Sequence, residues 1–217
     1  LDRAVSEAVV SLIQSFAARL DPQIPAVLAG HFSVDSAHWG SERNIMIGRD
    51  VAIPVSALTD PVWDYVALGH IHQHQNLNAG NMPPVVYAGS LERVDFGEEK
   101  QPKGFCWVEV QRGATIWRYV EVQARPFITI RADVRHEAHP LRAIERAIAG
   151  CDLADAVARL VVQMTPEQEP RLRDADLSPL LTDAFFAQIN RDVERIARDR
   201  LDGLEPDAMT PLYLLER

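Results

Sequence analysis

Cysteine is scarce in this 217-residue chain, which has only Cys106 and Cys151, both in apolar surroundings and far apart in sequence. Such a pair implies no disulfide framework, and it predicts a protein of the reducing cytoplasm. Long apolar runs are also lacking. No stretch reaches the roughly 18 residues that a membrane-spanning helix needs, and no signal peptide is recognisable, so we expect no membrane association.

Positive charge is in short supply, with 22 Lys and Arg residues against 31 Asp and Glu and a formal net charge of −9. Proteins that bind nucleic acid through a general electrostatic surface are usually basic, so the total charge argues against that class. It leaves nucleic-acid chemistry open, because bound divalent metals supply positive charge locally. The hydrophobic content of 47% is that of an ordinary globular protein with a substantial core.

Two patterns typical of buried strands, at 24–29 and 63–68, each run directly into a Gly-His pair. Strand ends are where α/β folds collect functional groups, and residues two apart in an extended chain project to the same side. Imidazole nitrogen is a common metal ligand. The alternative is a set of ordinary surface or structural histidines. The pattern favours metal binding, and the candidate ligands are His31, His70 and His72.

The order of the other expected elements indicates an α/β fold. Residues 1–20 place Val5, Val9, Leu12, Phe16 and Leu20 on one stripe with a 3.6-residue period, which predicts an amphipathic helix. Later patterns predict a strand at 85–90, a hairpin of 105–110 with 115–122, strands at 128–134 and 158–164, and helices at 140–149 and 183–201. Arg125-Pro126 marks a boundary, so we expect one domain over 1–124, a small α+β domain over 125–202 and a linker over 203–217.

The sequence lacks a carboxylate that would complete the histidine set. Two-metal sites that cleave phosphodiesters hold their ions roughly 3.5–4 Å apart, and we expect a bridging carboxylate to offset the repulsion between them. Asp35, Asp50, Asp60 and Asp64 are available, but none directly follows a predicted buried strand. The motifs Asp-x-His, Gly-Asp-x-x-Asp and Gly-Asn-His-Asp/Glu are absent. The sequence therefore predicts three ligands of an incomplete site.

Several short motifs carry a family resemblance. They are Ala29-Gly-His31, Ala67-Leu-Gly-His-Ile-His72, Tyr87-Ala-Gly-Ser-Leu-Glu92, Phe96-Gly-Glu98 and Lys103-Gly-Phe105. Together they resemble the calcineurin-like metallophosphoesterases and, more narrowly, the SbcD-type exonuclease subunits, which act with an SbcC-type ATPase in DNA double-strand-break repair. The resemblance extends over nearly the whole chain.

The resemblance implies a fold and a site. Residues 1–124 would be the C-terminal part of a metallophosphoesterase β-sandwich flanked by helices, and 125–202 the family's capping domain. Of two Mn²⁺ ions, one would be held by His31 and His70 and the other by His72. No catalytic residue is identifiable. Phosphate contacts are expected from Ser90, Arg93 and Lys103, for which ordinary turn residues are the equally weighted alternative.

The resemblance also implies 3′-to-5′ exonuclease and hairpin-opening endonuclease activity on double-stranded DNA ends, in a homodimer that binds an SbcC-type ATPase. The family's upstream motifs are absent and the chain starts at Leu1, so we expect an internal fragment that is inactive alone. Two alternatives stay open. One is a non-catalytic module that binds DNA or a partner, and the other is a phosphoesterase for a small phosphate ester, against which the second domain argues.

Overall fold

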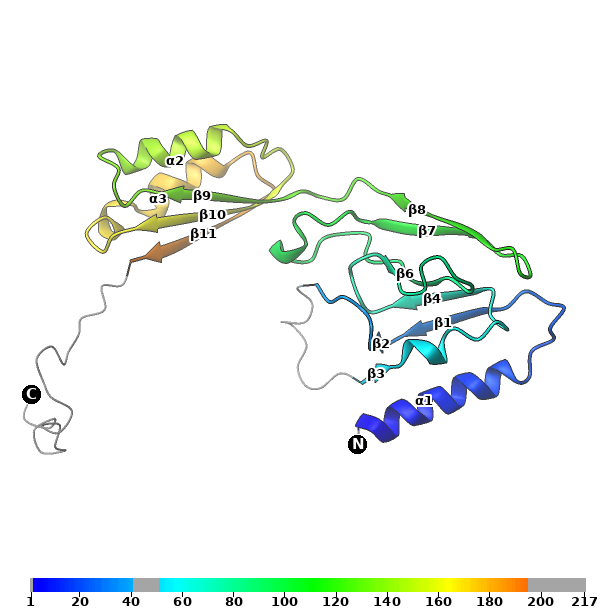
Figure 1. Cartoon of the computed structure of the whole chain (residues 1–217). Helices are drawn as coiled ribbons and strands as arrows, with labels where there is room; N and C mark the ends of the chain where they lie inside the picture. The colour runs from blue at the N-terminus through cyan, green and yellow to red at the C-terminus, as the bar shows by residue number, and fades with distance from the viewer. Residues whose placement is uncertain (1, 41–50, 195–217) are drawn as a thin grey trace, which may run out of the picture.

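The computed structural model describes residues 2–40 and 51–194, and it confirms the α/β fold (Figure 1). Its two larger sheets lie in different halves of the chain. The first has the strand order β1-β4-β6-β5 and the second the order β11-β10-β9. Among the described residues, no helix is long and apolar enough to cross a membrane.

The first sheet is parallel except for one short strand. Strand β1 (Val27–His31) pairs in parallel with β4 (Tyr65–Gly69), which pairs in parallel with β6 (Val85–Tyr87). The antiparallel strand β5 (Gln75–Asn76) completes the sheet beside β6. The carboxyl ends of β1, β4 and β6 therefore meet at one edge, as the sequence predicts for the two Gly-His segments. Gly30-His31 belongs to β1 itself, which starts and ends later than expected.

Shorter elements surround the first sheet. Strands β2 (Ser33–Val34) and β3 (Ala52–Ile53) form a small parallel pair, followed by the 3₁₀ turn η2 (Val55–Ala57). Strands β7 (Gly104–Glu109) and β8 (Ile116–Glu121) form the predicted antiparallel hairpin, and the 3₁₀ turn η3 (Phe96–Glu98) precedes it. Figure 1 shows the hairpin on one side of the first sheet and helix α1 (Asp2–Ala17) on the other.

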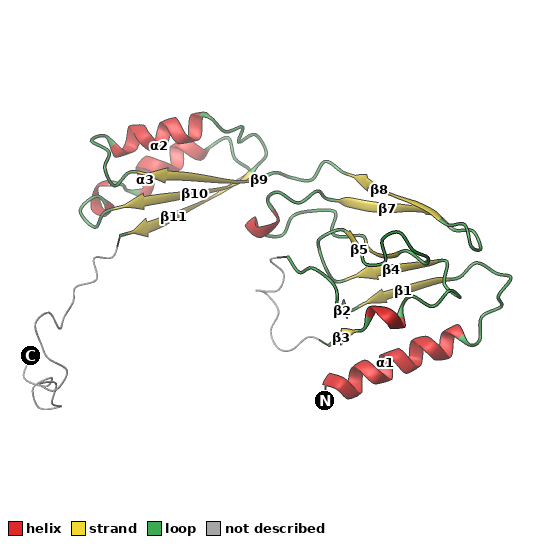
Figure 2. Ribbon diagram, in the orientation of Figure 1, coloured by secondary structure: helices red, strands yellow, loops and turns green. Residues whose placement is uncertain are grey.

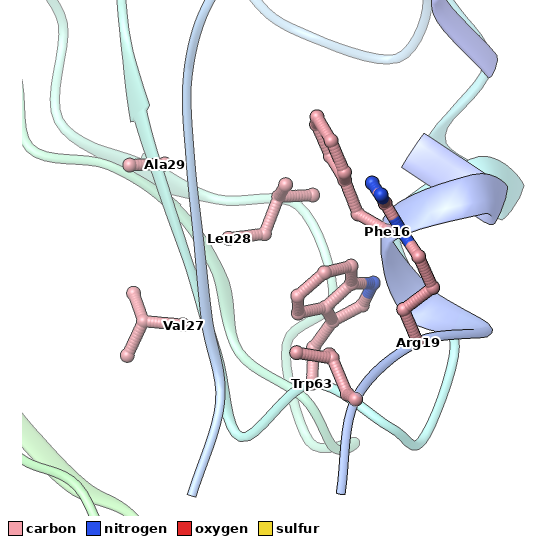
Figure 3. Close-up of a pocket in the computed structure, with 7 residues that line it drawn as sticks. Phe16, Arg19, Val27, Leu28, Ala29 and Trp63 are labelled. Carbon is pink, nitrogen blue, oxygen red and sulfur yellow. The ribbon is translucent and has the colours of Figure 1, made fainter. Parts of the chain in front are cut away.

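Helix α1 forms as predicted, but most of its apolar stripe is not buried. Ile13 is its buried residue, whereas Leu12 is 51% exposed and Phe16 is 42% exposed. Phe16 and Trp63 border a hollow of about 540 Å³ between α1 and β1 (Figure 3). The hydrophobic period predicted the helix correctly, but it did not reveal how closely the helix packs against the sheet.

The second sheet is parallel throughout, and Figure 2 shows α2 (Pro140–Ala149) along one face of it. Its strands are β9 (Phe127–Asp133), β10 (Val157–Met164) and β11 (Phe186–Val193). Strand β10 is central, and alternate residues along it are buried. Between β10 and β11 come η4 (Glu169–Arg171), α3 (Asp174–Leu177) and η5 (Ser178–Leu181). The core combines Ala158, Leu160, Val162 and Met164 of β10 with Ile144 and Ile148 of α2, among others.

The predicted helix over 183–201 is wrong for its described part, because residues 186–193 form strand β11. Ile189 and Val193 are four residues apart, so they share a face in a strand as well as in a helix. Both pack against the second core. All eight residues of β11 pair with β10, and this sheet pairing overrides the helical pattern. Residues 195–201 and the linker predicted at 203–217 lie outside the described residues.

The two sheets are joined by a contact between η3 and β9. The rings of Phe96 and Phe127 meet edge to face at 5.0 Å between centroids, and the Arg159 guanidinium lies 4.2 Å from the Phe96 ring centroid. The Thr129 amide donates a hydrogen bond to Glu99 Oε1 over 3.1 Å. The segment that leads from β6 to β7 thus contacts the second sheet.

Candidate metal site

His31 and His70 lie side by side at the carboxyl edge of the first sheet. Their ring centroids are 5.3 Å apart and their planes are inclined at 66°. Two imidazoles that share one tetrahedral ion, with metal–nitrogen distances of about 2.0–2.1 Å, would have centroids about 5 Å apart. His31 is exposed, whereas His70 is partly buried and its Nε2 atom is shielded from solvent.

Gly69 creates the room for this pair. His31 lies opposite Gly69 in the register of β1 and β4, and a Cβ atom at position 69 would lie 2.8 Å from His31 Nδ1. His70 follows with a φ of 101°, a conformation that side-chain-bearing residues rarely adopt. The glycine and the unusual backbone together turn the chain sharply, so that the His70 ring lies against the neighbouring strand's histidine.

His72 is held separately, by a buried carboxylate. Its Nδ1 atom is 2.7 Å from Glu98 Oε1, and Lys103 Nζ is 2.8 Å from Glu98 Oε2. The side chains of Glu98 and Lys103 are fully buried, whereas that of His72 is 32% exposed. Burial opposes ionisation of Glu98, but hydrogen bonds from Lys103, His72 and the Val94 amide prevail and hold the pKa of Glu98 below its usual value.

The backbone of His72 is fixed by the chain that follows β6. Its carbonyl accepts hydrogen bonds from the Ser90 amide over 3.2 Å and from Lys103 Nζ over 3.4 Å. Gly89 has a φ of +82°, and a Cβ there would lie 2.9 Å from the His72 carbonyl oxygen. Only glycine allows this close approach without displacing the histidine.

The described aspartates near the predicted site accept hydrogen bonds from backbone amides. Asp35 accepts a hydrogen bond from the Val55 amide, and Asp60 accepts one from the Val62 amide. Asp64 is 2% exposed and pairs with Arg112 over 3.1 Å. Burial opposes ionisation of Asp64, but hydrogen bonds from Gly113, Ala26 and Arg112 prevail and lower its pKa. Asp50 lies outside the described residues.

The donors present fit part of a metal site. Imidazole nitrogens suit zinc, manganese and related ions, and a carboxylate behind a ligating histidine is a common support. Within residues 2–40 and 51–194, however, no three His, Cys, Asp or Glu side chains converge on one point where a metal could bind. His31 and His70 are brought together, and His72 has its own partner. A complete site would need further ligands.

The phosphate contacts expected from Ser90, Arg93 and Lys103 stay a prediction. In the structure their polar groups have partners within the protein. Lys103 is buried against Glu98 and also donates to Ser90 Oγ over 2.9 Å. Arg93 donates to the backbone carbonyls of Glu98, Gln101, Ala124 and Arg125.

Glu98 is the residue near the site that reasoning from the sequence missed. It lies in a charged, glycine-containing stretch with no strand or helix period, so nothing local predicts a buried carboxylate there. The available signal is the motif Phe96-Gly-Glu98, which carries the resemblance but indicates no role for the carboxylate. His74, by contrast, stacks on Tyr119 at 4.1 Å and its Nδ1 contacts the Tyr87 carbonyl, which gives it a structural role.

The described residues form an α/β protein in which two histidines, His31 and His70, lie together at the carboxyl edge of a largely parallel sheet. Comparison with characterised proteins finds similarity to the SbcD component of nuclease SbcCD. The Escherichia coli K12 protein of that name is 25% identical over 224 aligned positions, which cover 90% of this chain and 54% of that protein. The Staphylococcus epidermidis protein is 24% identical over 106 residues, covering 48% of this chain and 27% of that protein.

The low identity to these relatives supports a distant relationship of this chain to SbcD-like nucleases. The chain spans about half the length of the Escherichia coli relative. No family model matches the chain.

Proposed function

We propose that this chain is part of a metal-dependent nuclease of the SbcD type, acting on double-stranded DNA ends in repair and recombination. One observation carries the proposal. The parallel pairing of β1 with β4 places His31 against His70, in a chain of which 90% aligns with a component of a nuclease. The chemical class is metal-assisted hydrolysis of a phosphodiester.

Each histidine has a role in this proposal. His31 and His70 would hold one divalent ion, preferably Mn²⁺, and His72 would contribute to a second. When bound, such ions polarise the phosphate and lower the pKa of attacking water. The protein's own contribution is to hold the imidazoles near the ends of rigid strands, so that their side chains lose little conformational freedom when a metal binds. Residues beyond the described set would supply the remaining ligands.

Partners and reaction type follow from the same relationship. We propose 3′-to-5′ exonuclease and hairpin endonuclease activity, in a homodimer that works with an SbcC-type ATPase. Residues 125–202, whose described part contains the second sheet, would be a capping domain over the DNA. The net charge of −9 fits a substrate held by metals rather than by a broad basic surface.

The test is cleavage of end-labelled double-stranded DNA with and without Mn²⁺. It compares the 217-residue chain with the product of its full reading frame. We expect the full product to shorten DNA only with metal, and His70→Ala to lose more in rate than the roughly 10- to 100-fold that removing a support of a metal ligand costs. His139→Ala, at the start of α2, is the matched control.

The 217-residue chain alone is expected to be inactive, because its described residues hold only part of a ligand set. Cleavage by this chain that is lost in His72→Ala would show that the site is complete here. A full product that cleaves nothing and binds no metal would favour the non-catalytic interaction module. Hydrolysis of a small phosphate ester without DNA cleavage would favour the phosphoesterase alternative.

A further inference from the structure

The carboxylate of Glu98 is shared between two basic groups. One oxygen lies 2.7 Å from His72 Nδ1, and the other lies 2.8 Å from Lys103 Nζ and 3.1 Å from the Val94 amide. Both carboxylate oxygens are therefore used, and the group is fully buried. Such an arrangement destabilises a protein unless each partner is satisfied, because buried charges lose their hydration.

The turn that carries Glu98 is itself held in place. Asp95 caps it by accepting a hydrogen bond from the Gly97 amide over 2.6 Å. Arg93 donates to the Glu98 carbonyl over 3.2 Å and to the Gln101 carbonyl over 2.9 Å. The carboxylate is thus presented by a segment with little freedom, and its oxygens cannot easily turn away from the His72 ring.

We propose that Glu98 is a positioning residue for His72. It fixes the imidazole as the tautomer with hydrogen on Nδ1, so that the Nε2 lone pair is free for a metal, and Lys103 is the buried counter-charge of the carboxylate. An ionised carboxylate only accepts hydrogen bonds, so the nitrogen facing it must donate. The other nitrogen then carries the lone pair. This inference rests on the proposed function insofar as the ligand is a metal.

A purely structural role, in which Glu98 only neutralises Lys103, explains less of the geometry. Neutralisation needs one oxygen, yet the second oxygen makes the shorter contact, to His72. Lys103 also donates to the His72 carbonyl, as the Ser90 amide does. The buried Glu98–Lys103 pair therefore contacts both the ring and the backbone carbonyl of His72, which is partly exposed. Such restraint on a surface histidine is expected when its orientation matters.

The experiment removes both buried charges together, so that no uncompensated charge is left inside. In Glu98→Gln/Lys103→Met the amide can face the ring with either its oxygen or its nitrogen, so His72 loses its preference for one tautomer. The control is Asp64→Asn/Arg112→Met, which removes a partly buried ion pair of the same region without touching a histidine. Nitrogen-15 NMR of the metal-free chain, well above the ordinary histidine pKa of about 6.5, assigns the tautomer.

We expect His72 to be protonated at Nδ1 in the wild type and the control, and mixed in the Glu98 double variant. Mn²⁺ affinity of the full reading-frame product at the second site, measured by calorimetry, is expected to fall about 10- to 100-fold in that variant and less than twofold in the control. Glu98→Asp withdraws the carboxylate from the ring but keeps a charge beside Lys103. It is expected to shift the tautomer in the same direction, which covers the case of a double variant that does not fold.

The outcomes separate the two proposals. A folded variant whose His72 tautomer is unchanged and whose Mn²⁺ affinity stays within twofold of wild type would overturn the positioning role. A tautomer that depends on Glu98, together with a full reading-frame product that binds no Mn²⁺, would support the positioning role and count against the metal-dependent nuclease.

Discussion

The two sheets of this protein are stabilised in different ways. The β9–β10–β11 sheet has seven or eight residues per strand, and its core is built from apolar side chains along β10 and α2. The β1–β4–β6–β5 sheet has strands of two to five residues. Every buried polar or charged residue among the described residues lies beside this sheet, namely Ser33, Asp64, Glu98 and Lys103.

This difference shows where function is built. Long, fully paired strands with a dry core need no special side chains, and the second sheet carries none of the candidate ligands. The first sheet combines short strands with a sharp turn at Gly69 and an unusual backbone at His70. Beside it lie one fully buried ion pair, Glu98–Lys103, and one partly buried pair, Asp64–Arg112. Features of this kind cost stability and are found where side chains must be held in a particular orientation.

The largest expected effect comes from unpairing the buried charges of the first sheet. Lys103→Met leaves Glu98 buried without its ammonium partner, and we expect the free energy of unfolding to fall by about 3–5 kcal/mol. Urea unfolding followed by tryptophan fluorescence measures it, because all four tryptophans lie before residue 125. The exposed Lys100→Met is the control. A loss below about 1 kcal/mol would mean that the pair does not stabilise this region.

The second sheet should respond to a cavity instead. Leu160→Ala removes a fully buried side chain from β10, and we expect a loss of about 2–5 kcal/mol. Hydrogen exchange should show lost protection in β9–β11, with the fluorescence transition less affected. Leu141→Ala, at a 36% exposed position of α2, is the control. Equal losses by both probes would show that the two regions unfold as one unit and would weaken the comparison.

Acid should destabilise the first sheet before the second. The pKa values of Asp64 and Glu98 are lowered in the folded state, despite the opposing effect of burial, by their hydrogen bonds. Groups with a depressed folded pKa contribute stability above their unfolded pKa, about 4, and lose it as pH falls below that value. We expect the fluorescence transition to weaken below pH of about 4, ahead of the exchange protection of β10.

Asp133 of β9 also has a lowered pKa, of about 2, through its hydrogen bonds from Arg135. That pair is exposed, so solvent screening makes its contribution small. Loss of β10 protection before the fluorescence change would contradict the assignment of acid sensitivity to the first sheet.

The smallest effect on stability, and the most specific effect on the site, is expected from Gly69→Ala. The added Cβ would approach His31 Nδ1 to 2.8 Å and push that ring away from His70. Because a side chain can move, we expect a stability loss of only about 1 kcal/mol, with a several-fold drop in Mn²⁺ affinity by calorimetry. Gly150→Ala, where a Cβ meets nothing within 4 Å, should change neither. Unaltered metal affinity in Gly69→Ala would argue against the shared His31–His70 site.

Much of the fold could be predicted from the sequence, because its signals are local. The period of residues 1–20 predicts α1, proline and glycine delimit α2, and alternation predicts β9. The strand β11 could not be predicted, since the spacing of Ile189 and Val193 fits both a helix and a strand, and pairing with β10 decides between them. The exposure of Phe16 could not be predicted either, because it depends on how α1 packs against β1.

The candidate site was predicted in part for the same reason. Gly-His after a buried strand is a local pattern that made His31 and His70 candidates, and the His-x-His spacing added His72. The structure brings His31 and His70 together, and their role as ligands stays a prediction. The Glu98–His72 contact joins residues 26 positions apart through an irregular segment, and no periodicity reports such a contact. The sequence context of Lys103 does not indicate burial, whereas the structure buries it against Glu98.

The central claim is that β1 and β4 bring His31 and His70 together as ligands of one metal ion. Calorimetric titration of the 217-residue chain with Mn²⁺ tests it directly, comparing wild type with His31→Ala, His70→Ala and the control His136→Ala. We predict weak binding in wild type and in the control, and at least a tenfold loss in each of the other two variants. Equal affinity in all four proteins, or an equal loss in His136→Ala, would contradict the claim.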